Sequence, residues 1–279
     1  YNTMREGTIT ACLIIIITLC SYLLYNIIEI NNNIKKLSNI NNINLLNSVL
    51  LSKVSVHPSA LKYLLDARII FIDGAEGSIS WSKYGWGDVT TDKEIVFNDK
   101  HSLKLRTVNR SWTIIEALRL FSPPKSKKVG FCFWWAALSE NLGYIVFGIE
   151  YRNANNNYRK AGEIYIYEHH RPYYKLENGT IVKFSSKTGL PERYDTSQRG
   201  GDICWHFVLI IVDFEKDEYV SLIIDDVEVD MRGIKIYDRS TREGMAQSNM
   251  MEVFVILSSG TKNASTTAFI DDVIVFSIE

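Results

Sequence analysis

The chain opens on an uncharged apolar run, residues 7–28, which reads GTITACLIIIITLCSYLLYNII. As a helix rising about 1.5 Å per residue, this run would span roughly 30 Å, the thickness of the hydrocarbon core of a bilayer. It lacks the polar face of an amphipathic core helix. It is not followed by the small-x-small cleavage site of a secretory signal peptide. The pattern therefore predicts an uncleaved transmembrane anchor over residues 1–30.

Asparagine dominates the next segment, where eight of the seventeen residues from 31 to 47 are Asn. Because Asn is a poor helix former, one interpretation is a flexible polar linker. The other is a helical stalk that self-associates, since isoleucines and leucines recur at spacings of three and four residues. Short helical segments are predicted over 48–56 and 59–68. Residues 31–68 are therefore assigned to a linker or stalk.

From residue 69 onward, the apolar residues recur in short segments of β type, separated by turns rich in Asn, Asp, Gly and Pro. A dozen such segments without a long amphipathic helix between them predict an all-β, two-sheet antiparallel sandwich over residues 69–279. The predicted strands are 69–72, 94–97, 102–107, 112–121, 128–136, 144–151, 163–168, 180–184, 205–214, 219–225, 251–258 and 268–276.

The net charge, the cysteines and the glycosylation sequons add information on partners, disulfides and location. The net charge of −1 provides no basic patch for nucleic acid, so no nucleic-acid partner is predicted. Cys132 and Cys204 both lie in apolar strand patterns, and their spacing allows either one disulfide or two buried free thiols. Glycosylation sequons beginning at Asn109, Asn178 and Asn263 are compatible with an extracellular location.

Four segments of the head resemble the jelly-roll sandwiches of carbohydrate-binding modules and concanavalin-like lectins. They are IIFIDGAEGSISW at 69–81, HSLKL at 101–105, WHFVLIIVDFEKDEYVSLIIDDVEVD at 205–230 and AFIDDVIVF at 268–276. The resemblance covers residues 69–279 and implies a jelly-roll fold. It does not establish that sugar is bound, because the same sandwich serves adhesion, hydrolysis and plain structure.

The resemblance also implies a structural calcium ion, because in many such modules the first and last strands lie side by side and share one. The oxygen donors would be Asp73 or Glu76 on one side and Asp271 or Asp272 on the other. Calcium prefers several carboxylate and carbonyl oxygens. The alternative is that these carboxylates belong to an ordinary turn.

Sugar binding requires aromatic rings that stack on the C–H face of the sugar, with polar groups nearby. Alternation along residues 128–136 puts Trp134 and Trp135 on opposite faces, so one ring packs in the core and the other can line a surface. Core packing is the alternative for every aromatic residue of this set. The predicted ligand-binding residues are Trp134, Tyr165, Tyr167 and Tyr173.

Glu163 and Glu168 are the candidates for a hydrolase pair, because lectin-fold glycosidases place two carboxylates on one strand with an acidic residue between them. Tyr165 occupies the position of that central acid. A spacing of five also puts the two glutamates on opposite faces of a regular strand, whereas a retaining pair must approach to about 5 Å. The sequence therefore predicts a protein that is not an enzyme.

The leading hypothesis is a membrane-anchored protein with an extracellular head that binds glycans, a surface glycoprotein or another surface molecule. The alternative is a structural subunit of a surface filament or coat, associating with copies of itself through the N-terminal helix. Residues 4–7, MREG, followed by the apolar run, resemble a type IV pilin leader cut after Gly7. Cys12 stands where the bacterial family usually has Glu, which is a departure from that pattern.

Overall fold

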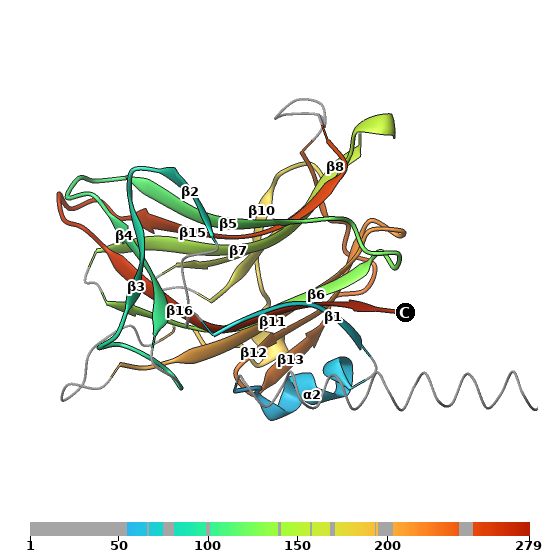
Figure 1. Cartoon of the computed structure of the whole chain (residues 1–279), viewed down its shortest axis with the longest axis horizontal. Helices are drawn as coiled ribbons and strands as arrows, with labels where there is room; N and C mark the ends of the chain where they lie inside the picture. Colours follow the sequence, from blue (N-terminus) through green and yellow to red (C-terminus); the bar gives the residue numbers. More distant parts are fainter. Residues whose placement is uncertain are drawn as a thin grey trace, which may run out of the picture. The chain divides into compact units, whose positions relative to one another are not determined.

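Two β-sheets pack face to face (Figure 1). Side chains alternate along the strands, so each sheet turns one apolar face towards the core between them. No helix among the described residues is both long and apolar enough to cross a membrane. The predicted anchor over 7–28 and the Asn-rich segment lie outside those residues. The computed structural model describes residues 55–65, 67–74, 81–98, 101–138, 141–156, 158–167, 171–192, 194, 203–239 and 248–279.

In the first sheet, antiparallel neighbours follow the order β13-β12-β11-β6-β16-β4-β3, and β1 also pairs with β16. The predicted neighbourhood of the first and last strands of the head is therefore confirmed, with Asp73 opposite Val273. The strands are β1 (Ala67–Asp73), β3 (Gly87–Asp92), β4 (Ser102–Thr107), β6 (Lys128–Leu138), β11 (His206–Asp213), β12 (Glu218–Ile224), β13 (Val227–Asp230) and β16 (Thr267–Ile278).

The second sheet follows the order β10-β9-β8-β7-β15-β5-β2, and β14 also pairs with β8. Its neighbours are antiparallel as well. The predicted two-sheet antiparallel sandwich is confirmed. The strands are β2 (Ser82–Gly85), β5 (Ile114–Phe121), β7 (Leu142–Asn153), β8 (Tyr158–Tyr167), β9 (Tyr173–Lys175), β10 (Ile181–Lys183), β14 (Tyr237–Asp238) and β15 (Met250–Ser259).

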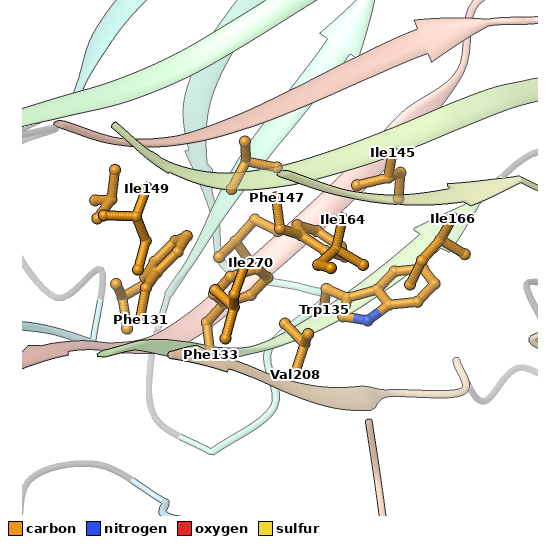
Figure 2. Close-up of a cluster of buried hydrophobic side chains, with 14 of the residues drawn as sticks. Phe131, Phe133, Trp135, Ile145, Phe147, Ile149, Ile164, Ile166, Val208 and Ile270 are labelled. Atoms are coloured by element: carbon orange, nitrogen blue, oxygen red, sulfur yellow. The ribbon is translucent and has the colours of Figure 1, made fainter. Parts of the chain in front are cut away.

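The main core lies between the sheets (Figure 2). Phe131, Phe133 and Trp135 of β6 point into it. Phe133 and Trp135 meet Phe147 of the second sheet, with ring centroids of Phe133 and Phe147 4.8 Å apart. The intervening Cys132 faces the opposite side of the first sheet. The predicted alternation along this strand is therefore confirmed, and Trp135 belongs to the core.

A short helix, α2 (Pro58–Leu64), covers the outer face of the first sheet. Pro58 opens it, and the His57 side chain caps it by accepting a hydrogen bond from the Ser59 N–H. Ala60 and Leu64 are buried in the cluster beneath it. The helix ends before residue 68, where the prediction placed its end, because the chain enters β1 at Ala67. The packed head thus includes residues well before 69.

Three expectations differ from the structure. The predicted strand 94–97 is wrong, because Asp92 Oδ1 accepts hydrogen bonds from the N–H groups of Glu94 and Ile95 and turns the chain. The strands β2, β3, β9, β13 and β14 were not predicted, since residues 82–92 lack a run of apolar residues and the other three strands are only two to four residues long. Cys132 and Cys204 form no disulfide: the first is buried and the second exposed.

Candidate functional site

Four tyrosines form a cluster on the outer face of the second sheet, which we call the tyrosine platform: Tyr144, Tyr165, Tyr167 and Tyr173. Tyr144 lies opposite Tyr167, and Tyr165 opposite Tyr173, in the register of β7, β8 and β9. Ring centroids are 5.1 Å apart for Tyr167 and Tyr173 and 5.6 Å apart for Tyr144 and Tyr167. The structure therefore brings together three of the predicted ligand-binding residues, Tyr165, Tyr167 and Tyr173.

The platform is anchored at Tyr165, which is buried, whereas the other three rings are half-buried. The Tyr165 hydroxyl donates a hydrogen bond of 2.6 Å to Glu163 Oε2. Burial and the charge of Glu163 raise the pKa of the Tyr165 phenol, and burial raises that of Tyr167. Both phenols therefore stay neutral beyond the ordinary phenol pKa of about 10, and the platform presents uncharged rings.

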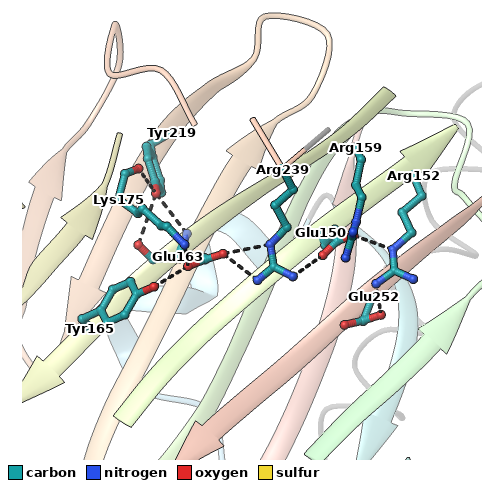
Figure 3. A network of polar contacts seen from close by, with 9 residues as sticks. All are labelled: Glu150, Arg152, Arg159, Glu163, Tyr165, Lys175, Tyr219, Arg239 and Glu252. Carbon is teal, nitrogen blue, oxygen red and sulfur yellow. Dashed lines mark hydrogen bonds and ion pairs between the residues drawn. The ribbon is translucent and has the colours of Figure 1, made fainter. Parts of the chain in front are cut away.

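Beside the platform, an ionic network covers the same face (Figure 3). Arg239, just after β14, bridges two carboxylates: its Nη1 lies 2.6 Å from Glu150 Oε2 and its Nη2 lies 2.6 Å from Glu163 Oε1. Arg159 Nε donates to Glu150 at 2.7 Å. Lys175 Nζ lies 3.1 Å from Glu163 Oε2. Four strands are thereby tied together by charge-assisted hydrogen bonds.

The two central carboxylates are deeply buried yet ionised. Burial opposes ionisation of Glu150 and Glu163, but the neighbouring guanidinium groups, Arg239 first, hold the pKa of each carboxyl below its ordinary value. A tyrosine from the first sheet supports the arrangement: the Tyr219 hydroxyl accepts from the Glu163 N–H at 3.0 Å and donates to the Lys175 carbonyl at 2.8 Å. The network is thus fixed from both sheets.

A third carboxylate, Glu252 on β15, behaves differently. Its Oε2 lies 2.8 Å from Arg152 Nη2, but Arg152 also donates to Glu150. Burial, together with the charges of Glu150 and Glu116, outweighs Arg152 and raises the pKa of Glu252 to about 7. The side chain is only 4 % exposed. Between about pH 4.5 and pH 7, Glu252 therefore stays protonated, whereas an ordinary glutamate is ionised.

This shift predicts a pH-dependent contribution to stability. Because the folded pKa of Glu252 lies above its ordinary 4.5, its stabilising effect is complete below that pH and is lost as pH rises through about 7. In the wild type, the free energy of unfolding should fall between about pH 5 and pH 8. Glutamine cannot ionise, so we expect this fall to be smaller in Glu252→Gln by roughly 1–3 kcal/mol. Urea unfolding at several pH values measures it. Glu215→Gln, at an exposed glutamate, is the control. Parallel profiles of wild type and Glu252→Gln would show that Glu252 does not titrate in this range.

Trp134 lies on the other sheet, away from the platform. Its ring stacks on Phe97 with centroids 4.0 Å apart and packs against His57 and Phe207. Its Nε1 donates to the Ser55 carbonyl at 2.9 Å. The structure therefore does not bring Trp134 together with Tyr165 and Tyr167, because strand β6 belongs to the first sheet and β8 to the second.

The predicted calcium ligands serve as hydrogen-bond acceptors. Asp73 Oδ2 accepts from Trp81 Nε1, Asp271 Oδ2 from the Phe97 N–H, and Asp272 Oδ2 from the Ser55 N–H, at 2.8–2.9 Å. Within the described ranges, no group of three or more His, Cys, Asp or Glu side chains could hold a metal ion. Glu76 lies outside the described residues, so the calcium ion stays a prediction.

Most of the ionic network was missed by sequence reasoning. A signal was present, since Glu150, Glu163 and Glu252 each interrupt an otherwise apolar strand pattern. A charge at such a position needs a buried partner. The partner that matters most, Arg239, is 76 and 89 residues away from the carboxylates that it bridges. Glu168, the second acid of the tested glycosidase pair, lies outside the described residues.

Comparison with known proteins supports the fold. No family model and no curated protein sequence matches the chain. Among solved structures, an endo-β-1,4-glucuronan lyase from the fungus Trichoderma reesei matches with a TM-score of 0.51 and 12 % identity, over 75 % of this chain and 95 % of the lyase. A carbohydrate esterase from Shiga toxin-encoding bacteriophage phi24B (TM-score 0.48, 14 % identity, 76 % and 100 %) and the carbohydrate recognition domain of Emp47p (0.44, 9 %, 74 % and 93 %) match more weakly. The head therefore has the jelly-roll fold that the sequence resemblance implied.

Proposed function

We propose that the protein is a non-catalytic, membrane-anchored cell-surface protein whose head binds glycans or another surface molecule through the tyrosine platform. The observation that carries the proposal is the grouping of Tyr144, Tyr167 and Tyr173 as half-buried, neighbouring rings on one outer sheet face. The predicted transmembrane run at 7–28 would hold the head outside the cell. The jelly roll is shared by enzymes and by carbohydrate recognition domains, so the proposal rests on the platform and not on the fold.

The chemistry of the platform suits a saccharide. Aromatic rings offer large apolar surfaces to the C–H faces of sugar rings, and the tyrosine hydroxyls offer donors and acceptors to sugar hydroxyls. Beneath the rings, Tyr165 is fixed by Glu163, and Glu163 by Arg239. A platform that is held in place before binding loses less conformational entropy when a ligand arrives.

The state of the carboxylates supports binding without catalysis. Glu150 and Glu163 are held ionised by guanidinium groups, so neither is suited to donate a proton to a leaving group. Glu252 keeps a proton up to about pH 7, but its side chain is almost completely buried and accepts a hydrogen bond from Arg152. We therefore assign the network the role of positioning the strands that carry the tyrosines.

A glycan array probed with the detergent-solubilised full chain tests this function. We expect binding to a subset of glycans, and we expect Tyr167→Ala and Tyr173→Ala each to weaken it about tenfold, the loss of roughly 1.4 kcal/mol from one stacked ring. Tyr167→Phe keeps the ring and should retain most of the affinity.

Tyr63→Ala is the matched control, because it removes a half-buried tyrosine from helix α2 on the other sheet. It should leave glycan binding unchanged. The glycan-binding part of the proposal is contradicted if no glycan binds, and the role of the platform is contradicted if the platform variants bind as tightly as the wild type. Release of products from a bound polysaccharide would contradict the non-catalytic part alone.

A further inference from the structure

A second aromatic feature lies at the β2 edge of the second sheet, separated from the platform strands β7, β8 and β9 by β15 and β5. There, a hollow of about 390 Å³ is lined by residues that include Tyr84, Trp86, Arg110, Ser111, Trp112 and Ile114. We call this feature the aromatic corner. None of the platform tyrosines lines it. Its volume falls within the range of small-ligand sites, about 300–1,000 Å³.

The aromatic side chains of the corner are unusually accessible. Tyr84 is 73 % exposed, Trp86 59 % and Trp112 62 %, whereas Trp81 and Trp135 are buried. Three large rings around one hollow leave apolar surface in water that a ligand could cover. More than half of each of these three side chains is left uncovered by the described part of the head.

The backbone under Trp86 is rigidly specified. Trp86 is the single residue between β2 of the second sheet and β3 of the first, so it stands where the chain changes sheets (Figure 1). Its N–H donates to the Ile114 carbonyl at 2.7 Å. A Cβ atom at Gly85 would lie 2.4 Å from the same carbonyl oxygen, and Gly85 has a φ of 96°. Only glycine fits at position 85. The tight turn there fixes the backbone of Trp86, whose indole points outward.

Trp112 is held in a conformation that a bulky residue rarely adopts. Its φ is 57°, in the left-handed region, which costs on the order of 1–3 kcal/mol. The Trp112 N–H donates to the Gly260 carbonyl at 3.1 Å, and the next N–H, that of Thr113, donates to Ser259 Oγ at 2.9 Å. An exposed indole on a strained, firmly bonded backbone is typical of a ligand-binding position.

The charge of the corner indicates the class of ligand. Arg110 is the one charged residue among those that line the hollow, and its guanidinium lies 5.9 Å from the centroid of the Trp86 ring. An arginine fork binds a carboxylate through two parallel hydrogen bonds. The indoles supply stacking surfaces beside it.

We infer that the aromatic corner is a second saccharide-binding site, selective for sugars that carry a carboxylate. The C–H faces of the sugar rings stack on Trp86 and Trp112, and the sugar carboxylate pairs with Arg110. This site does not depend on the tyrosine platform, because the two share no residue and lie on different strands.

Trigalacturonate and its methyl ester are matched probes, since they differ chiefly in charge. Binding to the full chain can be followed by tryptophan fluorescence and by calorimetry. We expect the ester to bind about tenfold more weakly than the acid, which corresponds to the loss of the charged pair. Arg110→Gln should weaken binding of the acid about tenfold and leave binding of the ester unchanged.

Trp112→Ala and Trp86→Ala should weaken both probes at least about tenfold, because stacking does not depend on the carboxylate. Trp112→Gly, which relieves the positive φ, is a second variant that removes the indole without threatening the fold. Tyr167→Ala is the control and should leave the affinity for trigalacturonate unchanged. The inference is overturned if acid and ester bind equally, if neither binds, or if Tyr167→Ala abolishes binding while Trp112→Gly does not. Loss of glycan binding at the platform alone leaves these outcomes unaffected.

Discussion

Replacing Arg239 with methionine is expected to lower the free energy of unfolding by about 3–5 kcal/mol, because it leaves two buried carboxylates without their shared cation. Arg239 is itself buried and bridges Glu150 and Glu163. Equilibrium unfolding in urea measures the loss. Arg239→Lys should lose less, since it keeps the charge, but a single ammonium cannot reproduce the fork that reaches both carboxylates.

The dependence of this loss on pH separates charge from packing. In the wild type, the pKa values of Glu150 and Glu163 are lowered from an ordinary 4.5, so their stabilising contribution is present above that pH and is lost as pH falls through the folded values. Without Arg239 both pKa values rise, and protonation in acid removes the negative charge that has lost its main partner. The difference in the free energy of unfolding between the wild type and Arg239→Met should therefore become smaller as the pH falls towards about 4–5. A deficit that is the same at every pH would mean that Arg239 acts through packing alone. Arg232→Met, at an exposed arginine paired with Asp230, is the matched control and should leave stability unchanged.

Replacing Phe254 with alanine is the second large expected loss, again about 3–5 kcal/mol in the free energy of unfolding. Phe254 is fully buried on the outer face of the second sheet, between the platform and the ionic network. Its ring lies over Gly148 of the neighbouring strand, so closely that a Cβ there would lie 2.1 Å from the ring. Removing the ring leaves a cavity over a residue that has no side chain to fill it.

A double-mutant cycle tests this packing. Gly148→Ala alone should destabilise the head, because its new methyl group meets the Phe254 ring. In Phe254→Ala the methyl group has room, so the double variant should be less destabilised than the sum of the two single variants. Strict additivity would mean that the ring and the glycine do not depend on each other. Leu120→Ala, on β5 of the same sheet but 45 % exposed, serves as the control and should cost little.

The two candidate sites place different demands on the fold. The tyrosine platform is built on the middle strands of a sheet, and buried ionic contacts hold those strands. The aromatic corner is built where one strand leaves the second sheet and the next joins the first, and glycine geometry holds that turn. A substitution of Arg239 should therefore weaken ligand binding at the tyrosine platform more than at the aromatic corner. If both proposals hold, the head presents two separate surfaces to saccharides.

Local patterns in the sequence predicted most of the longer strands, the two-sheet sandwich and the shared face of Phe131, Phe133 and Trp135, because alternation is a local property with a period of two residues. The sequence also placed Tyr165, Tyr167 and Tyr173 in one short region. Only the tertiary structure decided that Trp134 lies on the other sheet under Phe97, that Arg239 joins Glu150 to Glu163, and that Trp86 stands at a change of sheet. The physical reason is that strand pairing and ion pairing join residues far apart in the chain, and no local periodicity reports which distant segments meet.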